Sequence, residues 1–306
     1  AEALRHMRWW AVALAVATQG VSYWANGYTI QSVARLTGDR LGTLEAIGLA
    51  LAAGSVGLLT GGPVGYGAAS YHWTRNRGMS QEGAVICGWL PGILNAGAMI
   101  ALAAVGIVYL LFHHLLGRSQ LVPLGMLGAL VATIIVGGGW VLARKERVAR
   151  VLRAWSRLRR RRPNPDDIAA AAERLMTTRQ LMSSGGWRRP VLGAVANAGF
   201  DAATLYCLFV AARQDIAPGV LLAGYALPQV VGRLTFLPGG LGIVEGGMVG
   251  LYALLGVPAT ARVLVVLAYR ALSFWVPTLI GFPLAALFQR LVTRAERAAR
   301  CGGNSA

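Results

Sequence analysis

Apolar and polar positions follow one another in long blocks along the chain, and these blocks predict its helices. The apolar blocks are residues 8–31, 41–60, 82–114, 121–143, 190–212, 218–237, 241–257 and 260–289. About 20 apolar residues in a helix are enough to cross roughly 30 Å of hydrocarbon. The strands of an outer-membrane barrel would give short segments of alternating polarity, which this pattern lacks. We therefore predict an all-α, polytopic integral membrane protein.

Helix-breaking residues interrupt the apolar sequence at two places, after residue 60, where the helix resumes to Trp73, and between the blocks 218–237 and 241–257. The interruptions are Gly61 and Gly62 in the first half, and Pro238, Gly239 and Gly240 in the second. Backbone that unwinds at membrane depth is tolerated only where protein or a water-filled cavity satisfies its N–H and C=O groups. We therefore predict two re-entrant hairpins, each made of a broken helix that lines a site. The alternative is that every limb of each hairpin crosses the membrane.

The two interruptions are part of a wider correspondence between the halves of the chain. A constant offset pairs Leu59 with Leu237, Gly61 with Gly239, Gly62 with Gly240 and Gly78 with Gly256. Two related halves of opposite orientation are the plan of many transporters. We therefore predict two inverted repeats.

Glycines spaced four residues apart occur twice in the apolar blocks. They are Gly88 and Gly92 in the first half, and Gly242, Gly246 and Gly250 in the second. Small residues at this spacing let two membrane helices approach closely. We expect these glycines to be helix contacts rather than part of a site.

Composition supports a membrane protein and limits its partners. Of the 306 residues 56% are hydrophobic and 13% are charged, and the mean hydropathy of +0.54 is too high for an ordinary soluble domain. The net charge of +17 comes from arginines clustered between apolar blocks, which is typical of a positive-inside topology rather than of nucleic-acid binding. The three cysteines are scattered, and neither a disulfide framework nor a metal site is expected.

A basic segment separates two membrane halves. We divide the chain into a first half at 1–143, a cytoplasmic linker at 144–189, and a second half with a basic tail at 190–306. Arginines recur at helical spacing from residue 144 beside an apolar stripe, which predicts an amphipathic helix on a membrane surface. The arginines expected to contact anionic headgroups are Arg147, Arg150, Arg153 and Arg157. The simpler alternative is a topology anchor. Both the linker and the C-terminus are expected inside a bacterial-type inner (cytoplasmic) membrane.

Four charged residues fall within apolar blocks of the second half. They are Asp201, Arg233, Glu245 and Arg270. Because isolated charges are costly in the membrane, we expect the two acids and two arginines to neutralise one another. One interpretation is a pair of salt bridges that hold helices together. The functional interpretation is that the arginines bind a lipid phosphate, while the carboxylates balance them, hold a headgroup amine or carry a proton.

Four stretches of the chain resemble one known family. They are SYWANGYTIQSVARLTG at 22–38, YHWTRNRGMS at 71–80, LPGGLGIVEGG at 237–247 and LAYRALSFWVP at 267–277. They are similar to the transmembrane region of lysylphosphatidylglycerol synthases, the multiple peptide resistance factor proteins, and to their stand-alone membrane relatives. The resemblance implies a lipid flippase domain, with Glu245 and Arg270 as the matching polar residues. The soluble aminoacyl-transferase domain of the two-part proteins is absent from these residues, so the resemblance does not imply synthesis.

We therefore expect a lipid flippase or scramblase for a phospholipid, either one like aminoacylated phosphatidylglycerol or another anionic or polyprenyl lipid. Arg270 and Arg233 would bind the phosphate, and Glu245 and Asp201 would balance their charge. The main alternative is a non-transporting subunit that binds lipid for an enzyme partner or a fused domain. No enzymatic activity and no cofactor are expected, although a lipid-modifying enzyme is a third alternative. The sequence is compatible with both a monomer and a homo-oligomer.

Overall fold

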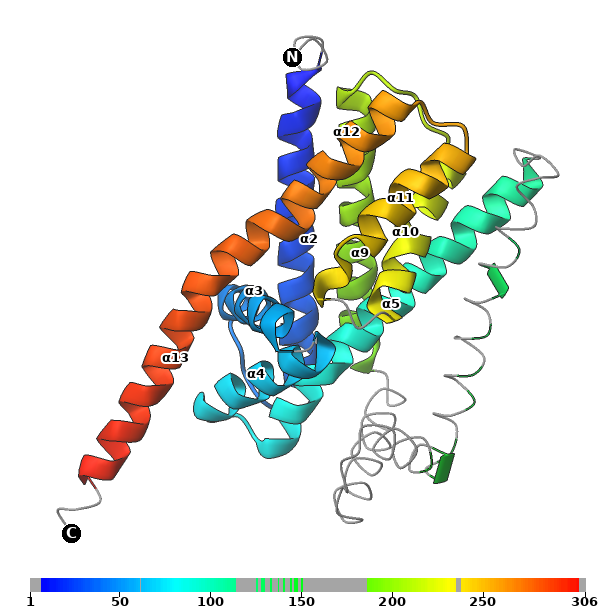
Figure 1. Ribbon diagram of the computed structural model, residues 1–306. Helices are drawn as coiled ribbons and strands as arrows, with labels where there is room; N and C mark the ends of the chain where they lie inside the picture. Colours follow the sequence, from blue (N-terminus) through cyan, green and yellow to red (C-terminus); the bar gives the residue numbers. More distant parts are fainter. Residues whose placement is uncertain are drawn as a thin grey trace. The chain divides into compact units, whose positions relative to one another are not determined.

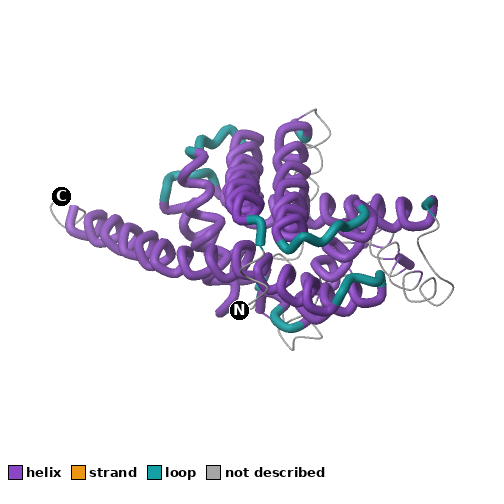
Figure 2. Tube along the Cα trace, turned by 90° about the horizontal axis from the view of Figure 1, so that it is seen from above, coloured by secondary structure: helices purple, strands orange, loops and turns teal. Residues whose placement is uncertain are grey.

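The protein is an all-α membrane protein, as predicted. The computed structural model describes residues 7–60, 62–113, 186–234 and 238–302, together with isolated positions between 125 and 150. All elements assigned in these ranges are helices (Figures 1 and 2). The chain forms two compact units, one of Ala1–Gln120 with Arg189–Ala306 and one of Leu121–Arg188. Most of the predicted helix at 121–143 and of the amphipathic helix from residue 144 lies outside the described residues.

The first unit contains the long helices of the described structure. They are α2 at Trp9–Leu36, α5 at Gln81–Phe112, α9 at Arg188–Ala211 and a rod made of α12 at Ala259–Arg270, η3 at Ala271–Trp275 and α13 at Val276–Gly302. Among the described residues, three segments are long and apolar enough to cross a membrane: Gln81–Phe112, Arg188–Ala211 and Ala259–Thr293. Figure 1 shows the rod running diagonally past the other helices, with the end of α13 well beyond them. The protein is therefore an integral membrane protein.

Two broken hairpins lie between the long helices. The first consists of α3 at Thr43–Leu59 and α4 at Pro63–Asn76, and the second of α10 at Pro218–Leu234, the short η2 at Pro238–Gly240 and α11 at Ile243–Leu254. At 1.5 Å per residue, α4 and α11 reach only about 18–21 Å, which is less than the hydrocarbon thickness. These lengths favour re-entrant hairpins over full crossings. The inverted relation between the two halves stays a prediction.

Glycine is required at the breaks themselves. Gly62, Gly239 and Gly240 have φ angles of 68°, 63° and 65°, and Gly242, just before α11, has a φ of 80°. Side chains with a Cβ atom rarely adopt this left-handed region, whereas glycine enters it without steric cost. The glycine-rich sequence therefore determines where each helix ends and its partner begins.

The interior is built on close approach of helix backbones. Helix α10 lies against α5, where a Cβ atom on Gly106 would be 2.6 Å from the backbone nitrogen of Ala223. Helix α13 packs on α3, where the Ser55 hydroxyl donates to the Thr278 carbonyl at 3.0 Å. Large apolar side chains such as Leu192 and Leu279 are instead two-thirds exposed, as suits a surface that faces lipid.

The glycines spaced four residues apart differ in whether they contact another helix. A Cβ atom on Gly88 would lie 2.9 Å from the Gly67 carbonyl oxygen, so the predicted close contact is made there. Gly92, Gly242, Gly246 and Gly250 are exposed, and no other described segment lies within 4 Å of their Cβ positions. For these four glycines the predicted helix contact is not made within the described residues and stays a prediction.

The contact between α5 and α10 gives a stability prediction. Gly106→Ala places a methyl group against backbone that cannot move independently, and we expect the free energy of unfolding to fall by about 1–3 kcal/mol. Gly97→Ala is the matched control on the same helix, since nothing lies within 4 Å of its Cβ position. That variant should stay within about 1 kcal/mol of wild type. Thermal unfolding in detergent measures both, and equal stability of the two variants would contradict the packing argument.

Candidate functional site

The second hairpin is joined to the α12 rod by a buried ion pair. Arg270 is the last residue of α12, and its Nε lies 2.6 Å from Oε1 of Glu245 near the start of α11. The Arg270 side chain is 5% exposed and that of Glu245 is 20% exposed. The guanidinium also donates from Nη2 to the Gly239 carbonyl at 3.2 Å and lies over the Phe274 ring. Arg270 thus contacts both the break in the hairpin and the helix that follows it.

Glu245 is held from two sides. While Oε1 accepts from Arg270, Oε2 accepts the backbone N–H of Gly242 at 2.8 Å. This is the return bond of a capping box, in which the third residue of a helix satisfies an N–H group that has no helical partner. The positive end of the helix dipole also favours a carboxylate at this place. The unwound backbone therefore positions Glu245 and Arg270, and these two side chains supply hydrogen bonds to the backbone groups of Gly242 and Gly239.

A π-helical segment begins directly after Arg270. In η3, at Ala271–Trp275, the backbone hydrogen bonds of the rod span five residues instead of the four of an α-helix. The prediction of one span from 260 to 289 missed this segment, because ALSFW contains no residue that breaks a helix. Single π turns often occur at functional sites. Here the segment carries Phe274, the ring that lies against the Arg270 guanidinium.

Asp201 is buried at 8% exposure and lies in a separate cluster of hydroxyl groups. Its Oδ2 accepts hydrogen bonds from Tyr225 of α10 and Tyr269 of α12, each at 2.7 Å. Gln229 donates to the Tyr269 hydroxyl at 2.9 Å. Among the described residues no arginine lies within ion-pair distance of Asp201. The expected neutralisation is therefore present for Glu245 and Arg270, while Asp201 has tyrosine partners instead, and the side chain of Arg233 is exposed near the end of α10.

An amide network connects three long helices beside Asp201. Asn95 of α5 donates to Asn26 of α2 at 3.0 Å, and Asn197 of α9 donates to Asn95 at 3.2 Å. Ser22 donates to Asn197 at 3.0 Å. Sequence reasoning noted only Asn197, one turn before Asp201 on α9. Asn95 could have been noticed as an amide in the middle of an apolar helix, whereas Ser22 and Asn26 are two of several polar residues on α2. Their mutual contact depends on the tertiary fold.

The remaining predicted residues lie in several places. Gly239 supplies a carbonyl to Arg270, and Gly62 ends the first break, whereas Gly61 lies outside the described residues. In the second unit the Arg147 guanidinium lies 3.8 Å from the centre of the Trp140 ring, and Arg150 is exposed. Arg153 and Arg157 lie outside the described residues. The lipid contact of these arginines stays a prediction.

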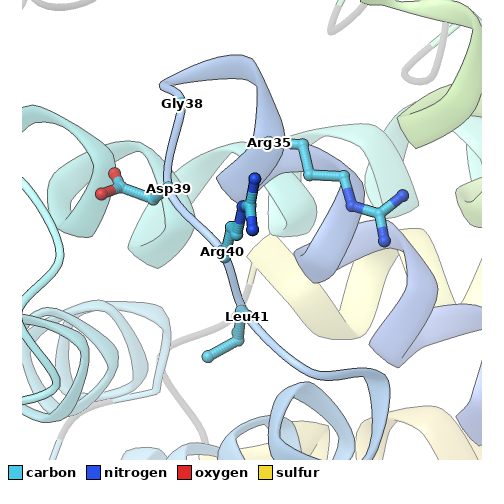
Figure 3. Close-up of a pocket in the computed structure, with 5 residues that line it drawn as sticks. All are labelled: Arg35, Gly38, Asp39, Arg40 and Leu41. Carbon is cyan, nitrogen blue, oxygen red and sulfur yellow. The ribbon is translucent and has the colours of Figure 1, made fainter.

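A pocket of about 480 Å³ lies at the loop between α2 and α3 (Figure 3). Its lining residues are Arg35, Gly38, Asp39, Arg40 and Leu41. Figure 3 shows the Asp39 carboxylate on the opposite side of the loop from the Arg35 guanidinium. Arg35 and Arg40 are both exposed. The charge offered by this pocket is therefore that of two guanidinium groups, which suits a phosphate.

The carboxylate of Asp39 is used in a structural tie. It accepts the Ser80 backbone N–H at 3.0 Å, the Ser80 hydroxyl at 2.8 Å and the Thr37 hydroxyl at 2.9 Å. Burial alone would raise the pKa of Asp39, but the bonds from Ser80 and Thr37 and the charge of Arg75 outweigh it and hold that pKa below its ordinary value. The tie fastens the α2–α3 loop to the N-cap of α5.

Comparison with known proteins identifies one family and several relatives. The family model described as the lysylphosphatidylglycerol synthase TM region matches residues 1–281. A UPF0104 membrane protein of Methanothermobacter thermautotrophicus is 35% identical over 77 residues, which are 25% of this chain and 23% of that protein. Another UPF0104 membrane protein of the same organism is 32% identical over 93 residues, which are 30% of this chain and 26% of that protein. The matched stretch thus spans about a quarter of these relatives.

The burial of the Arg270–Glu245 pair predicts its contribution to stability. Glu245→Ala leaves a buried guanidinium without a counter-charge, and we expect the free energy of unfolding to fall by about 3–5 kcal/mol. The matched control is Glu45→Ala, which breaks the exposed Glu45–Arg77 pair, with side chains 46% and 45% exposed, and should cost less than about 1 kcal/mol. Double-mutant cycles on both pairs measure the difference. Equal coupling energies would show that burial does not decide the strength of the pair.

The lowered pKa of Asp39 predicts a loss of stability in acid. A carboxyl group whose pKa is lowered by folding stabilises the protein at pH values above its pKa in the unfolded chain. This stabilisation is lost as the pH falls through the pKa of the folded state. We expect Asp39→Asn to be less stable than wild type at neutral pH and to lose this part of the acid dependence. Unfolding temperatures recorded over a pH series test this. Asp215→Asn, at an exposed aspartate of another loop, should keep the wild-type dependence.

Proposed function

Because the chain belongs to the lysylphosphatidylglycerol synthase transmembrane-region family, we propose that it moves a phospholipid between the two leaflets of a membrane. The observation that carries the proposal is the buried Arg270–Glu245 pair at the break of the second hairpin. A charged pair in an apolar segment is costly and is typical of a substrate pathway. A phosphate group is the lipid component that a guanidinium binds best.

Exchange of partners at Arg270 supplies the mechanism that we propose. The bonds to Glu245 and Gly239 use two of the five N–H donors of the guanidinium, so others can reach a phosphate. The arriving phosphate competes with Glu245 for Arg270. The displaced carboxylate can then hold a headgroup amine, as in an aminoacylated phosphatidylglycerol. Arg233, exposed near the same break, would give a second contact to the phosphate.

The break allows the site to change shape during this exchange. Helix α11 begins at Ile243, separated from the end of η2 by two residues, and its Glu245 carboxylate accepts the N–H of the N-cap residue Gly242. When Glu245 leaves Arg270, the hairpin loses one of its attachments to the α12 rod. Movement of the hairpin relative to the rod would then open the site toward one leaflet. A bacterial-type inner membrane, with the basic linker and the C-terminus in the cytoplasm, is part of the proposal.

A second candidate function rests on the pocket at the α2–α3 loop. Two exposed guanidinium groups beside a space of about 480 Å³ could hold an anionic headgroup without moving it across the membrane. A subunit that binds lipid and offers it to an enzyme partner would need only this site. In this case substitution of Arg35 and Arg40, rather than of Arg270, would abolish lipid binding.

Lipid movement in proteoliposomes tests the proposed function. Fluorescent phosphatidylglycerol and a membrane-impermeant quencher report the fraction of lipid that changes leaflet. We expect Arg270→Ala and Glu245→Gln to lower the rate at least about tenfold, the effect of losing a charge-assisted contact of roughly 1.4 kcal/mol or more.

Arg77→Ala is the matched control for this assay, since it removes an arginine from an exposed ion pair and should keep the wild-type rate. A folded Arg270→Ala protein with an unchanged rate would exclude Arg270 from the pathway. Absence of movement by wild type, together with lipid binding that Arg35→Gln and Arg40→Gln remove, would favour the second candidate function.

A further inference from the structure

Asp201 is a buried carboxyl group that does not belong to the Arg270–Glu245 site. It lies on α9, is 8% exposed, and belongs to a segment apolar enough to span the membrane. Neither the Arg270–Glu245 pair nor the Arg77–Glu45 pair includes Asp201, so neither neutralises it. A buried carboxylate without a cation beside it is costly, and binding a proton removes that cost.

The surroundings of Asp201 suit both of its protonation states. Tyr225 and Tyr269 donate to the same oxygen, Oδ2, and a carboxylate or the carbonyl oxygen of a neutral acid can accept both bonds. The amide of Gln19 lies within hydrogen-bonding reach of the carboxyl group, where its Nε2 can donate to the charged form. Rotation of the amide would instead bring Oε1, which is buried with no hydrogen-bond partner, to accept from the protonated acid.

The groups around Asp201 come from each helix packed against it. Helix α2 contributes Gln19 and Tyr23, α10 contributes Tyr225, Gln229 and Arg233, and α12 contributes Tyr269 and Arg270. Arg233 and Arg270 supply the positive charges in this set, and they act on the cluster over a longer distance than an ion pair. Protonation of Asp201 therefore changes the charge that Arg233 experiences, while Arg270 is linked to the cluster through Tyr269.

The α12 rod connects this cluster to the ion pair. Tyr269, which donates to Asp201, precedes Arg270, which donates to Glu245. The two residues belong to one helical turn, so a shift of that turn alters both contacts. Gln229 of α10 bonds Tyr269 and brings the first limb of the hairpin into the same connection. The state of Asp201 and the position of the hairpin are thus linked through a single turn of α12.

We propose that Asp201 is a proton-binding site and that its protonation is coupled to the opening of the Arg270–Glu245 pair, so that a proton gradient drives lipid movement. An O–H bond forms on the carboxyl group with a proton from water on one side of the membrane, and it breaks when that proton returns to water on the other side. Proton binding stands on the Asp201 cluster alone. The coupling rests on the proposed function.

Infrared spectroscopy of the purified protein in bilayers tests proton binding without any transport. A protonated carboxyl group gives a carbonyl band that should grow as the pH is lowered. We expect Asp201→Asn to lose one component of this band and Asp215→Asn, an exposed control, to keep it. Tyr225→Phe keeps the carboxyl group, and so it should retain the component with a shifted pH midpoint. A band that is the same in Asp201→Asn as in wild type would overturn the proton site.

Proteoliposomes with an imposed pH difference test the coupling. Wild type should move fluorescent phosphatidylglycerol faster with the gradient than without it, and Asp201→Asn should lose this acceleration while Asp215→Asn keeps it. Retention of the acceleration by Asp201→Asn would overturn the coupling. If wild type moves no lipid under either condition, the proposed function and the coupling fail together, and the infrared component still decides whether Asp201 binds a proton.

Discussion

The structure depends on the absence of water from the membrane interior. Every backbone N–H and C=O group at that depth needs a partner from the protein itself. The break of the second hairpin satisfies this requirement with charged side chains, since Arg270 donates to the Gly239 carbonyl and Glu245 accepts the Gly242 N–H. The ion pair and the unwound backbone are therefore one unit, and neither would be stable in the membrane without the other.

The same constraint is met differently at the acids Glu245 and Asp201. Glu245 has an arginine partner and the N-terminus of a helix beside it, so its charge is balanced. Asp201 has only neutral donors within hydrogen-bonding distance among the described residues, in the form of two tyrosine hydroxyls and an amide. The first arrangement favours a fixed charge that waits for a competing ion. The second favours a group that can take up or release a proton, and α12 contacts both.

Close backbone contact determines which parts can move together. Gly106 allows α10 to lie directly against α5, and Ser55 bonds α3 to the backbone of α13. These contacts fasten the first limb of each hairpin to a long helix. Helix α11 is different, because Gly242, Gly246 and Gly250 have open space at their Cβ positions in the described structure. One face of the second limb is thus open in the described structure, which leaves room for the movement of the hairpin that we propose.

The sequence by itself determined the class of protein, the helices and the breaks, because hydrophobic length and the conformational freedom of glycine act locally. It also singled out Arg270 and Glu245, since charges in apolar blocks are conspicuous. Only the tertiary structure decided which residue is the partner of each charge. Equal numbers of acids and arginines suggested two ion pairs, but Tyr225 and Tyr269, which look like ordinary apolar-block residues, reach Asp201 only when α9, α10 and α12 pack together. The π segment after Arg270 and the pocket beside Arg35 were equally undetermined, because hydrogen-bond register and the direction of side chains depend on neighbours far away in the sequence.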